Sequence, residues 1–80
     1  MQKEIFDPNY RRLVQHLLDT RRSLGLSRKQ VAAGLGVYWT WVAKVETCEI
    51  GLNLIGLLNL CRVYNLDPAQ LIKNLYGQRQ

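Results

Sequence analysis

The feature that most constrains the fold of this chain is a helix-start signal that recurs along it. Asp7-Pro8 and Asp67-Pro68 each place a capping side chain before a proline, the residue favoured at the first position of a helix. Ser27 and Gln30 have the spacing of a capping box, in which each side chain bonds to the backbone amide of the other residue. Because no segment alternates apolar and polar residues for long, as a strand would, the sequence predicts an all-α fold.

Stop signals divide the chain into about five helices. Gly25, Gly36 and Asn65 each follow an apolar, helically spaced stretch and can take the left-handed conformation that ends a helix. Asn53 can cap a fourth helix, whose inward face we expect to carry Leu54, Leu57, Leu58, Cys61 and Tyr64. The sequence therefore predicts one compact bundle of about five helices, as a single domain over residues 1–80.

Two of the expected helices are short and lie close together in the sequence. The first opens at Ser27, and the second spans residues 38–47 with Val42 and Val45 turned inward. A turn of about three or four residues, which contains Gly36, joins them. This arrangement predicts a helix-turn-helix at about residues 27–47.

The charge distribution indicates the kind of partner. Eleven Lys and Arg residues against six Asp and Glu residues give a net charge of +5. Between residues 11 and 44, Asp19 is the only acidic residue among seven basic ones. A basic surface on a small domain favours a polyanionic partner, usually nucleic acid.

Other classes of protein are disfavoured by what the sequence lacks. No apolar run approaches the roughly 18 residues that a membrane-spanning helix needs, and the N-terminus has no signal-peptide core. Cys48 and Cys61 cannot form a disulfide framework, and no His or Cys pair has the spacing of zinc ligands. His16 has no nucleophile or acid beside it in a catalytic pattern. We therefore expect a cytoplasmic protein without cofactor, metal or catalytic residues, which is not an enzyme.

Three stretches together resemble the XRE, or phage-repressor-like, helix-turn-helix family. They are Leu26–Ala32, then Leu35-Gly36-Val37, then Val42–Glu46, and the stretch from Leu57 to Leu71 is similar to the family's fourth and fifth helices. The resemblance covers about residues 13–73. It implies an ion pair between Arg21 and Glu46 that ties the first helix to the third and has a structural role.

The chain departs from the family pattern at positions that matter. Arg28 stands where the family usually has Gln, and Tyr38 stands where Ser or Thr usually follows the turn. Cys48 replaces the Gly after the third helix, so we expect that helix end to be strained or differently shaped.

The resemblance also implies which side chains contact DNA. By helical phase, four residues of the third helix share an exposed face that the family inserts into the major groove: Trp39, Thr40, Ala43 and Lys44. The expected phosphate contacts are Arg28, Lys29, Tyr38, Trp41 and Asn53. Three of these residues have a second interpretation. Trp39 can contact a protein, Trp41 can pack on the second helix, and Asn53 can be a simple helix cap.

One recognition helix reads only a few base pairs, so we expect a homodimer on a palindromic operator in double-stranded DNA. The expected dimerisation elements lie within residues 50–76, at Ile50, Leu52, Leu71, Ile72, Leu75 and Tyr76. The alternative is that the fifth helix only closes the core of the monomer.

These observations predict a sequence-specific transcriptional regulator, in the manner of a repressor or autoregulator. Through its DNA it would associate with the nucleoid. Phage repressors, controller proteins of restriction–modification systems and autoregulators on mobile elements all have this form. The alternative is a protein-interaction module or antitoxin-type subunit with the same fold, in which Trp39 and Trp41 anchor a partner.

Overall fold

The computed structural model describes residues 3–76, and these residues form helices, turns and loops but no strand. A short 3-10 helix, η1 (Lys3–Phe6), precedes the α-helices. These are α1 (Pro8–Ser23), α2 (Arg28–Leu35), α3 (Trp39–Glu46), α4 (Leu54–Tyr64) and α5 (Pro68–Tyr76). The prediction of an all-α bundle with a helix-turn-helix is confirmed.

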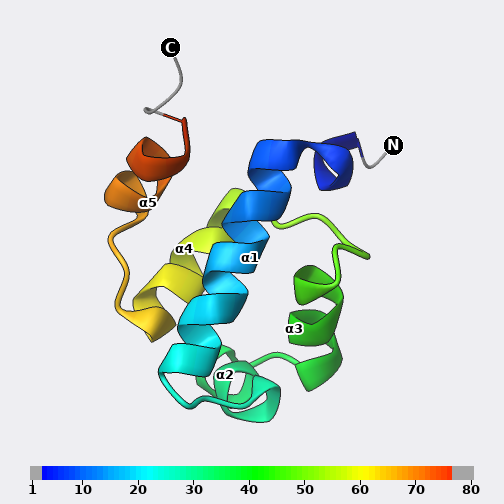
Figure 1. Cartoon of the computed structure of the whole chain (residues 1–80). Coiled ribbons are helices and arrows are strands. Elements are labelled where there is room, and N and C mark those ends of the chain that lie inside the picture. Colours follow the sequence, from blue (N-terminus) through cyan, green and yellow to red (C-terminus); the bar gives the residue numbers. More distant parts are fainter. Residues whose placement is uncertain (1–2, 77–80) are drawn as a thin grey trace.

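The helices are arranged around α1, the longest of them. Figure 1 shows α1 crossing the middle of the molecule, with α3 on one side, α4 and α5 on the other, and α2 at one end. η1, α3, α4 and α5 all pack against α1, and α2 packs against α3 and α4. The turn between α2 and α3 is three residues long, from 36 to 38. α3 therefore rests on α1 and α2 and leaves its remaining side free.

Each capping side chain that the sequence predicts accepts a hydrogen bond at the start of its helix. Asp7 Oδ1 accepts hydrogen bonds from the amides of residues 9 and 10. The Ser27 hydroxyl accepts from the Gln30 amide at 3.0 Å, and the Gln30 side chain accepts from the Ser27 amide at 2.8 Å. Asn53 Oδ1 accepts from the Gly56 amide at 2.7 Å. These bonds satisfy amides that have no partner within their own helices.

Four of the helices end in the same hydrogen-bonded turn. In each one, a residue in the left-handed conformation donates to the carbonyl three residues back, and the next residue donates to the carbonyl five back. The left-handed residues are Gly25 (φ 72°), Gly36 (φ 72°), Cys48 (φ 60°) and Asn65 (φ 58°). Glycine and asparagine tolerate this conformation, whereas other side chains are strained in it. Cys48 therefore keeps the shape of the glycine turn and carries the strain.

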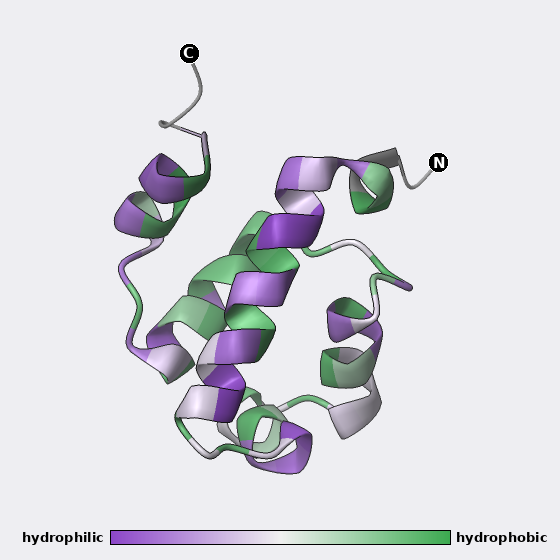
Figure 2. Cartoon of the chain, viewed as in Figure 1, coloured by the Kyte–Doolittle hydropathy of each residue, from purple (hydrophilic) through white to green (hydrophobic). Residues whose placement is uncertain are grey.

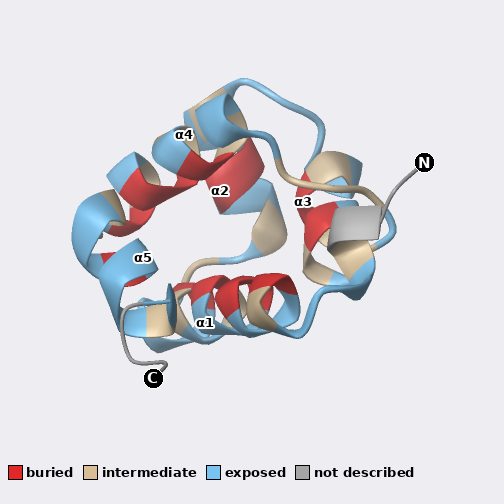
Figure 3. Cartoon of the chain, turned by 90° about the horizontal axis from the view of Figure 1, so that it is seen from above, coloured by how far each residue is buried: buried red, intermediate tan, exposed pale blue. Residues whose placement is uncertain are grey.

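The core lies where the inner faces of the helices meet. Figure 2 shows the apolar sides of α1 and α4 facing each other, and Figure 3 shows the buried residues on the inward faces. The buried apolar residues are Tyr10, Leu13, Val14, Leu17, Val31, Ala32, Val42, Val45, Leu57, Leu60, Cys61, Tyr64 and Leu71. Burial, with a smaller contribution from the charge of Asp67, raises the pKa of the Cys61 thiol. Cys61 is thus a protonated core residue at neutral pH.

The structure corrects three apolar positions. Leu54 and Leu58 are expected in the core but are exposed, because the buried stripe of α4 follows Leu57 and the rotation of about 100° per residue carries Leu58 out of it. Leu71 is expected at a dimer interface but is buried in the core of the monomer. It lies on the side of the short helix α5 that packs on α1 and α4.

Candidate nucleic-acid interface

The two sides of α3 have different environments. Val42 and Val45 are buried and hold the helix against the core. Thr40 and Lys44, one turn apart, are exposed, and Ala43 beside them is half-buried. The expected grouping of these three residues on the free side of α3 is therefore present in the fold. Their small or flexible side chains would let another molecule approach the helix closely.

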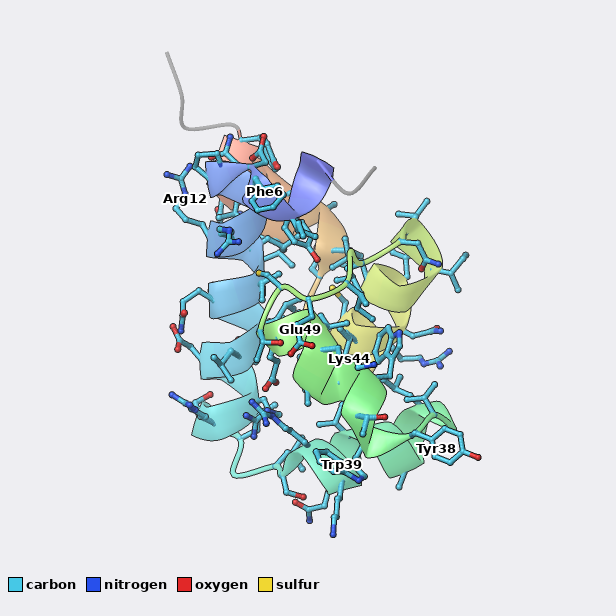
Figure 4. All side chains as sticks on the ribbon, turned by 90° about the vertical axis from the view of Figure 1, so that its right-hand side faces the viewer. Phe6, Arg12, Tyr38, Trp39, Lys44 and Glu49 are labelled. Atoms are coloured by element: carbon cyan, nitrogen blue, oxygen red, sulfur yellow. The ribbon has the colours of Figure 1, made fainter. Side chains whose placement is uncertain are left out.

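A tryptophan lies on either side of the Thr40–Lys44 surface. Trp39 and Trp41 are separated by about 200° around the helix axis. Trp39 is 46% exposed and lies at the end of α3 that is nearest the turn (Figure 4). Trp41 is half-buried and packs against the core, so the packing interpretation of Trp41 accounts for most of its ring. Trp39 is the tryptophan that another molecule can reach more easily.

A shallow groove runs beside α3 on the Trp41 side. It is lined by Gly36, Val37, Tyr38, Thr40, Trp41, Lys44 and Ile50. Tyr38 is 85% exposed, and Figure 4 shows its ring pointing away from the body of the molecule. Tyr38 stands at the start of α3 but makes no side-chain capping bond there. Its hydroxyl is thus placed to donate to a partner beside the free side of α3.

The other expected phosphate contacts lie at the starts of α2 and α4. Lys29 is exposed in the first turn of α2, and Arg28 beside it is partly exposed. The Asn53 side chain uses its oxygen to cap α4, so the capping interpretation is correct and only its amide nitrogen remains to donate outward. Positive helix ends of this kind attract anions.

Glu46, at the end of α3, accepts hydrogen bonds from two arginines. Arg21 Nε lies 2.6 Å from Glu46 Oε2, and Arg21 Nη2 lies 3.1 Å from Oε1, so the pair implied by the family resemblance is formed. Arg28 Nε lies 2.9 Å from the same Oε1. The bonds to Glu46 raise the pKa of the Arg21 guanidinium above its ordinary value. One buried carboxylate thus joins α1, α2 and α3.

Tyr64 lies under this charged cluster in the core. Burial, with a smaller contribution from the Glu46 charge, raises the pKa of Tyr64 to about 12. The phenol therefore stays neutral at all pH values at which the fold would ordinarily be studied.

The expected dimerisation residues do not form one exposed set. Ile50 and Leu52 lie half-buried in the loop between α3 and α4, and the Leu52 amide donates to the Tyr10 hydroxyl at 3.0 Å. Leu75 is also half-buried and packs against the core. Ile72 and Tyr76, one turn apart on α5, are the exposed members of the set.

Two features of this surface were not predicted from the sequence. The first is the bond between Arg28 and Glu46. The second is an exposed apolar face on α4 formed by Leu54, Ile55 and Leu58, of which Leu54 is 67% and Ile55 64% exposed. A signal for the second was available, because residues 54–61 are apolar around most of the helix, more than one buried stripe can use.

Residues 3–76 contain no helix that is long and apolar enough to cross a membrane. The same residues hold no group of three or more His, Cys, Asp or Glu side chains that could bind a metal ion.

A solved structure resembles this one closely along nearly the whole chain. It is an XRE-family like protein from Pseudomonas syringae pv. tomato str. DC3000, with 32% sequence identity and a TM-score of 0.88. The match covers 98% of this chain and 95% of the Pseudomonas protein. The chain belongs to the XRE-like family. A scan against models of protein families gives no match, and a search of the curated proteins gives none either. The XRE relationship thus rests on the fold and on the identity to the solved relative.

Proposed function

We propose that this XRE-like protein is a sequence-specific DNA-binding transcriptional regulator that places α3 in the major groove. The observation that carries the proposal is the free side of α3. Thr40 and Lys44 project from a helix whose opposite side, Val42 and Val45, is buried. A major groove about 12 Å wide admits one α-helix, and the base edges at its floor are what such side chains can read.

Each residue on this side of α3 has a distinct part in the proposed contact. The Lys44 ammonium donates to guanine O6 and N7, and Thr40 bonds to a base or packs its methyl group on a thymine methyl. Ala43 is small enough to let the helix sit deep in the groove. Trp39, on the flank, packs on deoxyribose or a thymine methyl and can donate from its indole nitrogen.

Contacts to the DNA backbone fix the orientation of α3. Arg28 and Lys29 at the start of α2 are proposed to bind phosphates on one side of the groove. The Tyr38 hydroxyl, the Trp41 indole nitrogen and the Asn53 amide are proposed to do so on the other side. These contacts supply affinity that does not depend on sequence and that salt weakens.

A homodimer on a palindromic operator completes the proposal. Two recognition helices related by a two-fold axis would read half-sites about 34–36 Å apart. With Leu71 in the core, the proposed interface is reduced to Ile72 and Tyr76, with the edges of Ile50, Leu52 and Leu75. The proposed mode of action is repression or autoregulation, because an operator-bound dimer can block a promoter without any further activity.

A second function, in protein binding, is favoured by a specific observation. Tyr38, Leu54 and Ile55 are all more than half exposed. The apolar side chains of Leu54 and Ile55 have no polar group with which to bind a phosphate. The buried centres of protein interfaces are more apolar than the rest of the surface, and aromatic residues such as tyrosine are enriched there. An antitoxin-type subunit or adaptor would use them to hold its partner.

Selection of bound sites from random duplex DNA, followed by a salt titration, tests the first function against the second. A regulator yields one palindromic consensus, and its affinity falls steeply with salt, with a slope of about −0.9 for each phosphate neutralised. Recovery of no consensus, together with a flat salt response, would leave the protein-binding function as the better account. Sedimentation of the free protein at micromolar concentration tests the dimer separately.

A further inference from the structure

We propose that Glu46 is a positioning residue for DNA binding, which orients Arg28 so that the two terminal nitrogens of its guanidinium grip one phosphate. This inference rests on the proposed DNA-binding function and adds a mechanism to it. The two arginines that share the Glu46 carboxylate differ in how many of their nitrogens are already bonded.

Arg21 has a partner within the fold at each of its three nitrogens. Its Nε and Nη2 both bond to Glu46, and its Nη1 donates to the Leu26 carbonyl at 2.9 Å. Its side chain is only 10% exposed. Arg21 therefore serves to fix the Glu46 carboxylate in the interior.

Arg28 uses only one of its three nitrogens in the same cluster. Its Nε donates to Glu46 Oε1 at 2.9 Å, and Nη1 and Nη2 make no hydrogen bond to any residue that the structure describes. Its side chain is 37% exposed, whereas that of Glu46 is 5% exposed. The bond at Nε fixes the plane of the guanidinium, and a guanidinium held in this way offers its remaining donors as a fork.

The position and the charge of this fork suit a phosphate. Arg28 is the first residue of α2, and Lys29 beside it is exposed. Two guanidinium groups against one carboxylate leave the cluster with a net charge of +1, so Arg28 still attracts an anion while it is paired. A bidentate bond from arginine to phosphate has favourable geometry and is stronger than a single bond from an ammonium.

The pairing with Glu46 would also lower the entropy lost on binding. A free arginine on the surface has to give up many rotamers when it grips a phosphate. Arg28 has already given them up in the folded protein. Arg28 stands where the family usually has Gln. Its orienting partner is Glu46, the same carboxylate that pairs with Arg21 and ties α1 to α3.

The first experiment compares Arg28→Lys with Lys29→Gln on a mixed-sequence duplex, because phosphate contacts do not depend on an operator. Arg28→Lys keeps the charge but loses the planar fork, so we expect the affinity to fall about three- to tenfold with an unchanged salt slope. Lys29→Gln removes one exposed charge, and its salt slope should become less steep by about one unit. Wild-type affinity in Arg28→Lys would overturn the inference and leave the DNA-binding function intact.

The second experiment follows the Arg28 guanidinium itself by 15N NMR in the wild-type protein. We expect its Nε–H signal to be resolved without DNA, and to persist when the mixed-sequence duplex is added, while rotation of the Nη groups slows only in the complex. Loss of the Nε–H signal on binding would show that Arg28 leaves Glu46, and would overturn the positioning role. Failure of the wild-type protein to bind any duplex would instead contradict the proposed function as a whole.

Discussion

The indole of Trp41 lies so close to Gly56 that a methyl group on Gly56 would stand 3.2 Å from Trp41 Cζ2. The same methyl would stand 3.0 Å from Leu52 Cδ1 and 3.1 Å from Asn53 Oδ1, the atom that caps α4. Gly56 therefore leaves room for the Trp41 side chain of α3 at the start of α4.

Gly56→Ala should lower the stability of the fold although alanine is the better helix former. The gain in helix propensity of up to about 1 kcal/mol is opposed by the three close contacts. Gly34→Ala is the matched control, because its nearest neighbour would be Val63 Cγ2 at 3.9 Å, an ordinary contact. Urea unfolding should show a higher midpoint for Gly34→Ala and a lower one for Gly56→Ala. Equal stabilisation by both would contradict the close packing described.

Cys48→Gly should be more stable than Cys48→Ala by about 1 kcal/mol, since both lose the thiol and only the alanine keeps a Cβ in the left-handed conformation. Because both variants lack the half-buried sulfur, its packing does not contribute to the difference in their stability. Thermal unfolding of the two variants under reducing conditions measures this difference. Greater stability of the alanine variant would contradict the left-handed conformation of residue 48.

Glu46→Ala should destabilise the fold by roughly 3–5 kcal/mol, because it leaves the buried Arg21 without its partner and frees Arg28 as well. Glu49→Ala is the control, since Glu49 is exposed and should change stability by about 0.5 kcal/mol or less. Both are measured by denaturant unfolding in the absence of DNA. An unchanged unfolding midpoint in Glu46→Ala would contradict the structural role of the ion pairs that Glu46 makes with Arg21 and Arg28.

The fold should lose stability as the pH rises from about 10 towards 12, because the buried phenol of Tyr64 is harder to ionise in the folded protein than in the unfolded chain. Burial favours the neutral phenol, so the contribution of Tyr64 is complete below the pKa of about 10 in the unfolded chain and is lost as the pH approaches the pKa of about 12 in the folded one. The total loss of unfolding free energy is about 3 kcal/mol. Over this interval the urea midpoint of the wild type should fall relative to that of Tyr64→Phe, which has no phenol to ionise. Parallel curves would show that Tyr64 does not titrate differently in the two states.

Lys44→Ala should weaken binding to the selected operator by about 1–3 kcal/mol and alter the base preference at one position in each half-site. Lys73→Ala is the control for charge alone, because Lys73 is exposed on α5, away from the turn between α2 and α3. Competition binding against operator variants reads out both effects. If the two lysine variants behave alike, Lys44 does not read a base.

The capping of the helices was predictable because it depends on residues that are neighbours in the sequence. Ser27 and Gln30, or Asn53 and the amide of Gly56, find each other once a helix forms, whatever packs around them. The buried positions Val42 and Val45 follow in the same way from helical phase.

The second partner of Glu46 was not predictable in this way. Arg28 and Glu46 are 18 residues apart, and a long side chain at the start of α2 has many rotamers, so only the packed structure selects the one that reaches the carboxylate. The exposure of Leu54 and the burial of Leu71 likewise depend on which helices cover α4 and α5, and local sequence does not specify this. The DNA contacts at Trp39, Thr40, Ala43 and Lys44 remain predictions.

The division of α3 into a buried and a free side has an evolutionary consequence. Val42 and Val45 maintain the fold, and none of the proposed base-reading residues belongs to the fully buried core. Substitutions at Thr40, Ala43 and Lys44 can therefore accumulate with little loss of stability. Under the proposed DNA-binding function, the preferred operator would drift while the scaffold is conserved. We therefore expect relatives that differ at these three positions to prefer different operators, and exchange of the three side chains between them to transfer that preference as one unit.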